Sequence, residues 1–258
     1  MSKIELSAEQ LADFERDGYV IARGYFNQDE IAKLQEKAFN DPRLHSDAWH
    51  KKDAEGTVSK VCLWQETGDD LYSMFSRSRR LVDSVEKIIG EECYHTSTKM
   101  MMKEPKVGGA WEWHQDFGYW HHDNLMLYPK AVSCMIAVNQ ATEENGCLQV
   151  LKGSHKLGRL DHGRTGDQKG AEMQFVEEAM KYLDLVYVEL EPGDTLFFHC
   201  NLLHKSNANR SDHPRWCMIS AFNAMTNQPF RDNEAKYYPL NRVDDDAILN
   251  WTEETAQA

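Results

Sequence analysis

Hydrophobic positions in the first ninety residues recur mostly at helical spacing. Ser7 and Gln10 have the spacing of a capping box, which marks the beginning of a helix. That helix leads into a short apolar run at residues 19–22, and a second amphipathic helix follows it. A third helix is expected over residues 78–89, ending at Gly90, because glycine commonly terminates helices.

From about Tyr94 onward, short apolar or alternating runs replace the helical pattern and predict β-strands. Turns are expected at Asn145-Gly146 and at Pro192-Gly193-Asp194. Residues 159–181 are polar and partly helical in pattern, which indicates an insertion or a lid. The expected strands cover residues 131–138, 147–151, 185–190, 195–198 and 216–222.

Short strands at this spacing are typical of a sandwich or a barrel. The pattern therefore predicts one continuous domain over residues 1–258, mainly β with α. We expect residues 1–92 to form a mainly helical support. Residues 93–225 are expected to form the β core, with the lid inserted at about residues 155–183.

Charge and composition narrow the classes of function. The chain has 29 Lys and Arg against 42 Asp and Glu, which gives a formal net charge of −13. Nucleic acids and anionic membranes require a basic face, so neither is an expected partner. No apolar run approaches the roughly 20 residues of a transmembrane helix, and no secretory signal pattern is visible. The six cysteines form no CxxC pair, so we expect reduced thiols and a cytoplasmic location.

The segment Trp-His-Gln-Asp at residues 113–116 places two metal-binding side chains two positions apart. On a strand, His114 and Asp116 would share one face and converge on one ion. A third ligand is available from His199 or His204. Two histidines and one carboxylate form the facial triad of non-heme Fe(II) oxygenases. Taken alone, the pattern is also compatible with an ordinary histidine at a strand end.

Arg215 follows His204 by eleven residues, and Ser206 follows it by two. A guanidinium binds a carboxylate bidentately, and a neighbouring hydroxyl adds a further hydrogen bond. The two side chains are therefore suited to the distal carboxylate of a dicarboxylate. A surface salt bridge is the alternative for an isolated arginine.

This combination of residues resembles the phytanoyl-CoA dioxygenase-like branch of the Fe(II)- and 2-oxoglutarate-dependent oxygenases. The resemblance spans roughly residues 8–225 and implies a double-stranded β-helix (jelly-roll, cupin-like) core with a helical N-terminal layer. Besides the HxD motif, the distal histidine and the arginine, it rests on four flanking segments: DGYV at 17–20, NGCL at 145–148, KGSHK at 152–156 and EPGD at 191–194.

The resemblance implies that His114, Asp116 and His204 bind Fe(II), and that Arg215 and Ser206 bind 2-oxoglutarate. The expected reaction consumes O2 and 2-oxoglutarate, releases succinate and CO2, and hydroxylates a small-molecule substrate. Because the carboxylate ligand is present, hydroxylation is expected rather than halogenation, for which related enzymes carry a small residue at this position.

Further contacts to 2-oxoglutarate are expected from neighbouring strands. Ser133, in the strand after HxD, is one candidate, and Lys99 or Thr98 on the preceding strand are others. His199 lacks an arginine at the family spacing and is assigned either to structure or to the residues that support the metal ligands.

Two groups of residues are candidates for the substrate site. Trp120 and Tyr119 can present aromatic faces to an ammonium group, although Trp120 also fits a purely hydrophobic wall. In the lid, His162 and Arg164 suit an anionic group, although a solvated loop has the same composition.

Asn201 and Asn223 flank the expected pocket and are candidates for polar contacts to substrate. The substrate that best fits these hints is an aminophosphonate or a quaternary-ammonium or other zwitterionic compound.

Several alternatives stay open. The stretch WHQDFGYWH resembles that of ectoine hydroxylases, but Gln115 and Gly118-Tyr119 replace their Ser and Glu-Thr. An acyl-CoA substrate would favour a basic entrance, of which the sequence gives no sign. A zinc hydrolase can use the same donor set, and a sensor would bind metal and 2-oxoglutarate without turnover. The sequence does not indicate an oligomeric state.

Overall fold

The computed structural model describes residues 4–230, 237 and 239–254. The helices, in chain order, are α1 (Ala8–Asp17), α2 (Gln28–Asn40), α3 (Arg43–Ser46), α4 (Leu71–Arg77), α5 (Arg79–Ile89), α6 (Asp116–His122), the 3-10 turn η1 (Ser154–Lys156), α7 (Met173–Ala179) and α8 (Ala247–Asn250). Across these residues, no helix is long and apolar enough to cross a lipid bilayer.

The strands are β1 (Tyr19–Ala22), β2 (Trp49–Lys52), β3 (Val58–Trp64), β4 (Cys93–Lys103), β5 (Trp111–His114), β6 (Ala131–Ala137), β7 (Leu148–Leu151), β8 (His162–Thr165), β9 (Gln168–Ala171), β10 (Leu185–Val188), β11 (Thr195–His199), β12 (His204–Ser206) and β13 (Arg215–Ala224).

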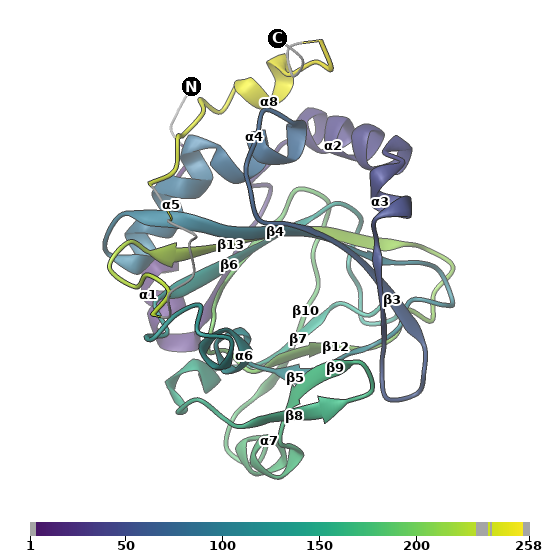
Figure 1. Cartoon of the computed structure of the whole chain (residues 1–258), viewed down its shortest axis with the longest axis vertical. Helices are drawn as coiled ribbons and strands as arrows, with labels where there is room; N and C mark the ends of the chain where they lie inside the picture. The colour runs from purple at the N-terminus through teal and green to yellow at the C-terminus, as the bar shows by residue number, and fades with distance from the viewer. Residues whose placement is uncertain (1–3, 231–236, 238, 255–258) are drawn as a thin grey trace.

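Two antiparallel sheets face each other and form the core (Figure 1). The larger sheet has the strand order β1-β11-β6-β13-β4-β3-β2, and the smaller sheet has the order β10-β7-β12-β5. The expected strands at residues 131–138 and 216–222 are the central β6 and β13, and every residue of both is buried. The predicted fold class, a jelly-roll core with a helical layer, is confirmed.

Helices α2, α4 and α5 cover the outer face of the larger sheet (Figure 1). The Ser7–Gln10 capping box is present at the beginning of α1, and Asn27 forms a second one with Glu30 at the beginning of α2. Helix α5 ends at Gly90, whose φ of 82° is readily adopted only by glycine. The local sequence signals therefore located α1, α2 and α5, whereas α3 and α4 were not predicted.

The N-terminal segment also contributes strands, which the sequence analysis did not predict. Strand β1 pairs with β11, and the β2–β3 hairpin extends the larger sheet beyond β4. Strand β2 reads Trp-His-Lys-Lys and carries no apolar alternation, so its pattern gives no strand signal. Residues 1–92 therefore contribute three strands, β1, β2 and β3, to the larger sheet besides forming the helical support.

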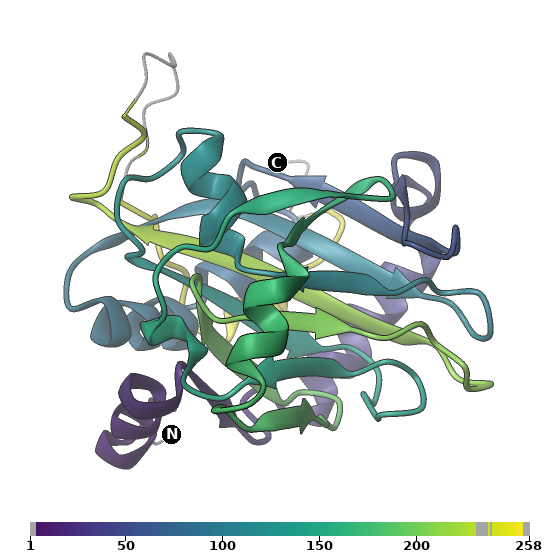
Figure 2. The same ribbon diagram turned by 90° about the horizontal axis from the view of Figure 1, so that it is seen from below.

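The insertion contains a β-ribbon as well as a helix. Strands β8 and β9 pair with each other, and α7 follows them. Seen from below, the ribbon and α7 lie across the smaller sheet (Figure 2). Gln168 of β9 attaches the ribbon to β5, because its side chain bonds Glu112 N at 2.9 Å and Ala110 O at 3.0 Å.

The inner face of the larger sheet follows from strand alternation. On β4, Met100 and Met102 belong to the core beneath the helices, whereas Met101 belongs to the core between the sheets. Because successive side chains point to opposite faces, Lys99 and Lys103 lie on the same inner face as Met101. Two lysines are thereby directed into the space between the sheets.

A buried ion pair joins two helices of the outer layer. Arg80 of α5 donates to Glu30 of α2, with Nη2 2.5 Å from Oε1, and the two residues are 4% and 2% exposed. Arg80 also donates to Tyr25 O at 3.1 Å and lies over the Phe26 ring. Arg80 Nε also pairs with Asp245 Oδ1 at 3.3 Å, so removal of the Glu30 carboxylate would leave the buried guanidinium with only this partly exposed carboxylate among the described residues.

We expect Glu30→Ala to lower the free energy of unfolding by about 3–5 kcal/mol, measured by urea denaturation. Glu36→Ala, on an exposed position of the same helix, is the matched control and should change stability little. Equal losses in the two variants would contradict the role assigned to the Arg80 pair.

Candidate metal centre and active site

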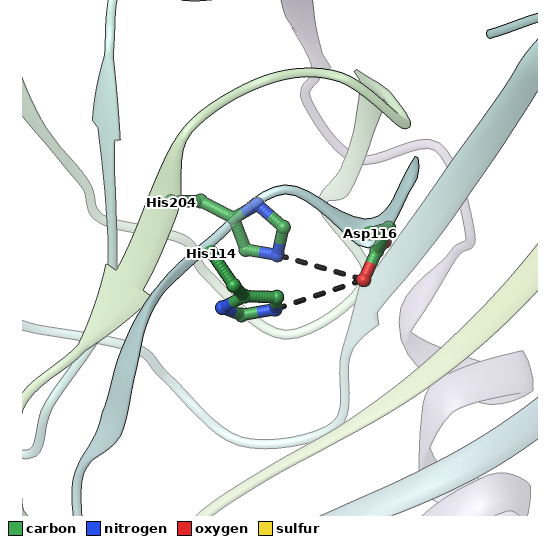
Figure 3. Close-up of side chains that lie close together, drawn as sticks. All are labelled: His114, Asp116 and His204. Atoms are coloured by element: carbon green, nitrogen blue, oxygen red, sulfur yellow. Dashed lines mark ion pairs between the residues drawn. The ribbon is translucent and has the colours of Figure 1, made fainter. Parts of the chain in front are cut away.

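Strand pairing in the smaller sheet brings two histidines together. Strands β5 and β12 are antiparallel, and His204 is the register partner of His114. Both side chains are buried, and their ring centroids are 4.0 Å apart. Figure 3 shows both rings directed toward Asp116.

Backbone carbonyls fix the orientation of both imidazoles. Nδ1 of His114 donates to Glu112 O at 2.7 Å, and Nδ1 of His204 donates to Leu202 O at 2.9 Å. The Nε2 atoms therefore face Asp116 Oδ1, at 3.6 Å from His114 and 4.0 Å from His204. Such hydrogen bonds hold a metal-binding histidine in the tautomer that offers Nε2 as ligand.

Asp116 reaches this position from a helix rather than from a strand. Gln115 is still extended, with φ −110° and ψ 128°, and Asp116 is the first residue of α6. The expectation that His114 and Asp116 share one face of a strand is therefore wrong. The two side chains converge because the chain turns from β5 into α6 between them.

The Asp116 carboxylate is buried and surrounded by donors. Ser133 Oγ donates to Oδ2 at 3.0 Å, and the Tyr119 hydroxyl donates to Oδ1. Burial alone would raise the pKa of Asp116, but the hydrogen bond with His114 and the nearby charge of Lys99 hold that pKa well below its usual range. The carboxylate is thus anionic.

Burial and the neighbouring His114 lower the pKa of His204 to about 3, which leaves its imidazole neutral. The ligand atoms of His114, Asp116 and His204 all lie within 4.8 Å of one another. Two imidazole nitrogens and one carboxylate oxygen in this arrangement match the facial donor set of non-heme Fe(II) oxygenases.

His199, the competing third ligand in the sequence, lies elsewhere. It ends β11, accepts a hydrogen bond from Asn201 N at 3.0 Å, and packs beside His155. These contacts, which lie away from the three-residue cluster, are consistent with a structural role for His199.

A second polar cluster lies where β13 begins and β4 ends. Arg215 and Lys103 are register partners, and they are 2% and 0% exposed. Arg215 Nη2 contacts Met135 Sδ at 3.7 Å, and Lys103 Nζ donates to Asn207 O. Burial, and then the charge of Arg215, lower the pKa of Lys103 well below its ordinary value.

This cation pair has no directly contacting anion within the described residues, although the buried Asp53 acts on Lys103 at longer range and raises its pKa. Neither Arg215 nor Lys103 forms an ion pair there, and Arg215 Nε has no hydrogen-bond partner. Buried cations without a counter-charge are costly, so the cluster is suited to an anionic ligand. Ser206, the other predicted contact, is buried on β12.

Lys103 is a functional candidate that the sequence analysis missed. A signal was present, because the stretch Lys-Met-Met-Met-Lys at residues 99–103 places a lysine at each end of an apolar run. Strand alternation puts both lysines on one face, and such a placement of charge in a central strand indicates a ligand or a partner.

Thr98 does not reach this site. It lies on the opposite face of β4 from Lys99, and its hydroxyl bonds His95 Nε2 at 2.7 Å and Ser220 Oγ at 3.0 Å. Ser133 is on the inner face but holds Asp116. Of the three further cosubstrate candidates, Lys99 alone lines a cavity among the described residues.

Two predicted substrate contacts, Asn223 and Asn201, have structural partners instead. Asn223 donates to Tyr94 Oη at 2.7 Å and to Asn227 O at 2.8 Å. Asn201 donates to the carbonyls of His155 and Leu157 at 3.0 and 2.6 Å. These amides are therefore engaged in holding loops, and their expected role in binding substrate is not supported by the geometry.

His162 is likewise a positioning residue. Its Nδ1 donates to Leu160 O at 2.9 Å, and its Nε2 accepts from Gln115 N at 2.9 Å. The ring packs so closely on Gly118 that a Cβ there would lie 2.0 Å from it. His162 thus attaches the β8–β9 ribbon to the segment that carries Asp116.

Gln115, the residue between the two ligand candidates of the HxD motif, strengthens this attachment. Its side chain donates to Asn201 O at 3.0 Å and to Gly158 O at 3.3 Å, and it accepts from Leu160 N at 2.8 Å. One buried amide therefore connects the HxD segment, the loop before His204 and the insertion.

Two cavities adjoin Tyr119. The outer cavity, about 670 Å³, lies under the insertion and is lined by His162, by Arg164 (whose side chain is 83% exposed) and by both acidic and basic side chains. We call the other, of about 340 Å³, the tryptophan cavity; it is lined by Trp49, Lys51, Val61, Leu63, Ser97, Lys99, Trp111, Tyr119, Trp120, Asp123, Asp167, Gln168 and Lys169.

The tryptophan cavity adjoins the three-residue cluster. Tyr119 stacks on the His114 ring with centroids 5.8 Å apart, and Trp111 lies 6.4 Å from the same ring. Both residues also form walls of the cavity, together with Trp120. The two predicted aromatic contacts, Trp120 and Tyr119, are therefore on its surface.

Comparison with solved structures agrees with this geometry. Crystal structures of EctD from Sphingopyxis alaskensis, one with bound Fe and one with 2-oxoglutarate and 5-hydroxyectoine, superpose with TM-scores of 0.77 and 0.76. They are 25% and 26% identical in sequence, and each comparison covers 95% of this chain and 89% of the other.

Curated relatives point in the same direction. An ectoine dioxygenase from Sphingopyxis alaskensis is 28% identical over 263 residues, covering 95% of this chain and 85% of the relative. An L-proline trans-4-hydroxylase from Streptomyces griseoviridis is 31% identical over 176 residues, covering 62% of this chain and 66% of the relative. The family model described as Phytanoyl-CoA dioxygenase (PhyH) matches residues 14–217, which is more than half of the chain. The chain therefore belongs to the phytanoyl-CoA dioxygenase family of Fe(II)- and 2-oxoglutarate-dependent oxygenases.

Proposed function

We propose that this dioxygenase hydroxylates an aliphatic carbon of a small polar metabolite, and that His114, Asp116 and His204 hold its Fe(II). The observation that carries the proposal is the convergence of two fixed Nε2 atoms and one anionic oxygen at a buried point beside a cavity. Fe(II) bound there would supply the activation of O2, and the protein supplies ligands, orientation and exclusion of water.

Arg215 and Lys103 are proposed to bind the distal carboxylate of 2-oxoglutarate. The support is their burial side by side and the unpartnered Nε of Arg215. An incoming carboxylate would neutralise two cations that no anion among the described residues contacts directly. Ser206 is proposed to add its hydroxyl, as the family resemblance implies.

For the substrate, a small cyclic amino-acid-like zwitterion is favoured. The relatives act on ectoine and on proline, according to their names. An ectoine-like compound therefore has more support than the aminophosphonate or quaternary-ammonium compound suggested by the sequence. The replacements at Gln115 and at Gly118-Tyr119 argue for a substrate that differs from ectoine itself.

An acyl-CoA substrate has little support. The outer cavity contains Arg159, Arg164 and Lys169, but carboxylates from the same walls offset their charge (Asp161, Asp167 and Glu172). The phosphates of coenzyme A would meet no net positive entrance there. A zinc hydrolase would not need the buried Arg215–Lys103 pair, and a sensor that does not turn over would need no substrate cavity at the metal.

We expect Asp116→Ala to weaken Fe(II) binding by more than about 100-fold, because even the outer partners of metal ligands are worth about 10–100-fold. The measurement is an anaerobic Fe(II) titration with 2-oxoglutarate, following the visible charge-transfer band and then succinate release in air. Asp184→Ala, at an exposed aspartate, is the control. A normal band and near-normal succinate formation in Asp116→Ala would remove Asp116 from the metal site.

Arg215→Gln and Lys103→Met should each raise the 2-oxoglutarate concentration needed for the band, with little change in the iron requirement. Loss of one partner of a buried charge pair is worth about 2–5 kcal/mol, which is roughly 30-fold or more. Arg210→Gln, at an exposed arginine, is the control. Because Lys103→Met keeps the apolar stem, it separates loss of charge from loss of packing; unchanged 2-oxoglutarate dependence in both variants would overturn this assignment.

A further inference from the structure

Strand β2 contributes a wall of the tryptophan cavity that no motif predicted. Its register partners are Val61 for Trp49 and Ser59 for Lys51. Val61 belongs to the core between the sheets, so alternation places Trp49 and Lys51 on the inner face, and His50 and Lys52 on the outer face. Trp49 remains 54% exposed, at the rim of the cavity.

The acidic groups of this cavity are already neutralised. Asp123 accepts from Lys169 Nζ at 2.9 and 3.1 Å. Asp167 lies 3.9 Å from Arg164 and accepts from Lys52 N at 3.4 Å. These carboxylates therefore offer little free negative charge to a cationic ligand.

Two lysines that line the cavity, Lys51 and Lys99, differ from these paired carboxylates. Within residues 4–230, 237 and 239–254, neither Lys51 nor Lys99 forms an ion pair or a side-chain hydrogen bond, and both are half-buried. Lys99 lies on strand β4 inside the larger sheet, and Lys51 lies on the edge strand β2. The free charge facing the cavity is thus positive.

Much of the remaining wall is apolar. Trp49, Trp111 and Trp120 come from β2, β5 and α6, and Val61 and Leu63 of β3 also line the cavity. Indole faces pack well on rings and aliphatic groups. The cavity therefore combines a large apolar surface with two unpartnered cations at about 340 Å³.

We propose that the substrate carries an anionic group, a carboxylate or a group of similar charge, that binds Lys51 and Lys99 while its apolar body packs against Trp49, Trp111 and Trp120. This inference rests on the proposed hydroxylase function. It assigns substrate selection to the β2–β3 hairpin, and it excludes compounds whose only charge is an ammonium group.

The test compares three probes with one ring and different charge: cyclohexanecarboxylate, cyclohexanecarboxamide and cyclohexyltrimethylammonium. Binding to the full chain, loaded anaerobically with Fe(II) and 2-oxoglutarate, is followed by tryptophan fluorescence and by calorimetry. We expect the carboxylate to bind at least about tenfold more tightly than the amide, because a hydrogen bond to a charged group is worth about 1.5–3 kcal/mol.

Three variants distinguish the contribution of charge to probe binding from the contribution of packing. Lys51→Gln should remove most of the preference for the carboxylate, whereas Lys52→Gln, on the outer face of the same strand, should keep it. Trp49→Ala should weaken the carboxylate and the amide by the same factor. Equal binding of the amide or the ammonium probe, no saturable binding of the carboxylate, or an unchanged preference in Lys51→Gln would overturn the proposal.

The same samples report on the proposed function separately. The visible band of the Fe(II)–2-oxoglutarate complex measures the metal site, and the probes measure the cavity. A missing band with a retained carboxylate preference would refute the oxygenase chemistry but not the anion site. A normal band without that preference would refute the anion site alone.

Discussion

Burial of the charged Asp116 carboxylate is the constraint on which the centre of this molecule depends. A carboxylate withdrawn from water is stable only where donors or a cation replace its hydration. Ser133 from β6 and Tyr119 from α6 donate to its two oxygens, and His114 from β5 lies beside it. Both sheets and the beginning of α6 must therefore meet in the correct register. The contacts that close the jelly roll are the same contacts that shape the metal-binding site.

Groups of opposite charge lie at the two ends of the interior between the sheets. Its anionic end is Asp116, and its cationic end is the Arg215–Lys103 pair. Lys99 and Lys103 are four residues apart on one face of β4, which corresponds to ~13 Å along the strand, with Met101 between them. A dicarboxylate that reaches from a metal at one end to the cations at the other would complete the charge balance of the core. The cosubstrate is then part of the packing as well as of the chemistry.

Much of the fold was predictable from the sequence because it depends on local signals, and the proposed metal ligands His114, Asp116 and His204 were predictable through the resemblance of their motifs to the family. Capping boxes, apolar strand runs and the spacing of the HxD motif, the distal His204 and Arg215 are visible along the chain. What escaped prediction depends on contacts between distant segments. The run at residues 99–103 marks Lys103 as unusual, but its pairing with Arg215 becomes visible only from the strand register. Strand β2 has a polar sequence, and its pairing with β3 alone reveals which side chains face inward. Asn201 and Asn223 sit near the expected pocket, yet loop carbonyls and neighbouring side chains occupy their amides.

Strand β2 is the last strand of the larger sheet and pairs on one side only, with β3. An edge strand is the part of a sheet whose replacement disturbs the fewest neighbours. Here a four-residue edge carries two inward side chains that form a cavity wall, while the proposed metal ligands lie on other strands and on a helix. Changes in this segment can therefore alter molecular recognition without altering the reactive centre. A strand at the border of the sheet and a cluster inside it are thus physically separate, so the sequence of one can vary while the other stays the same.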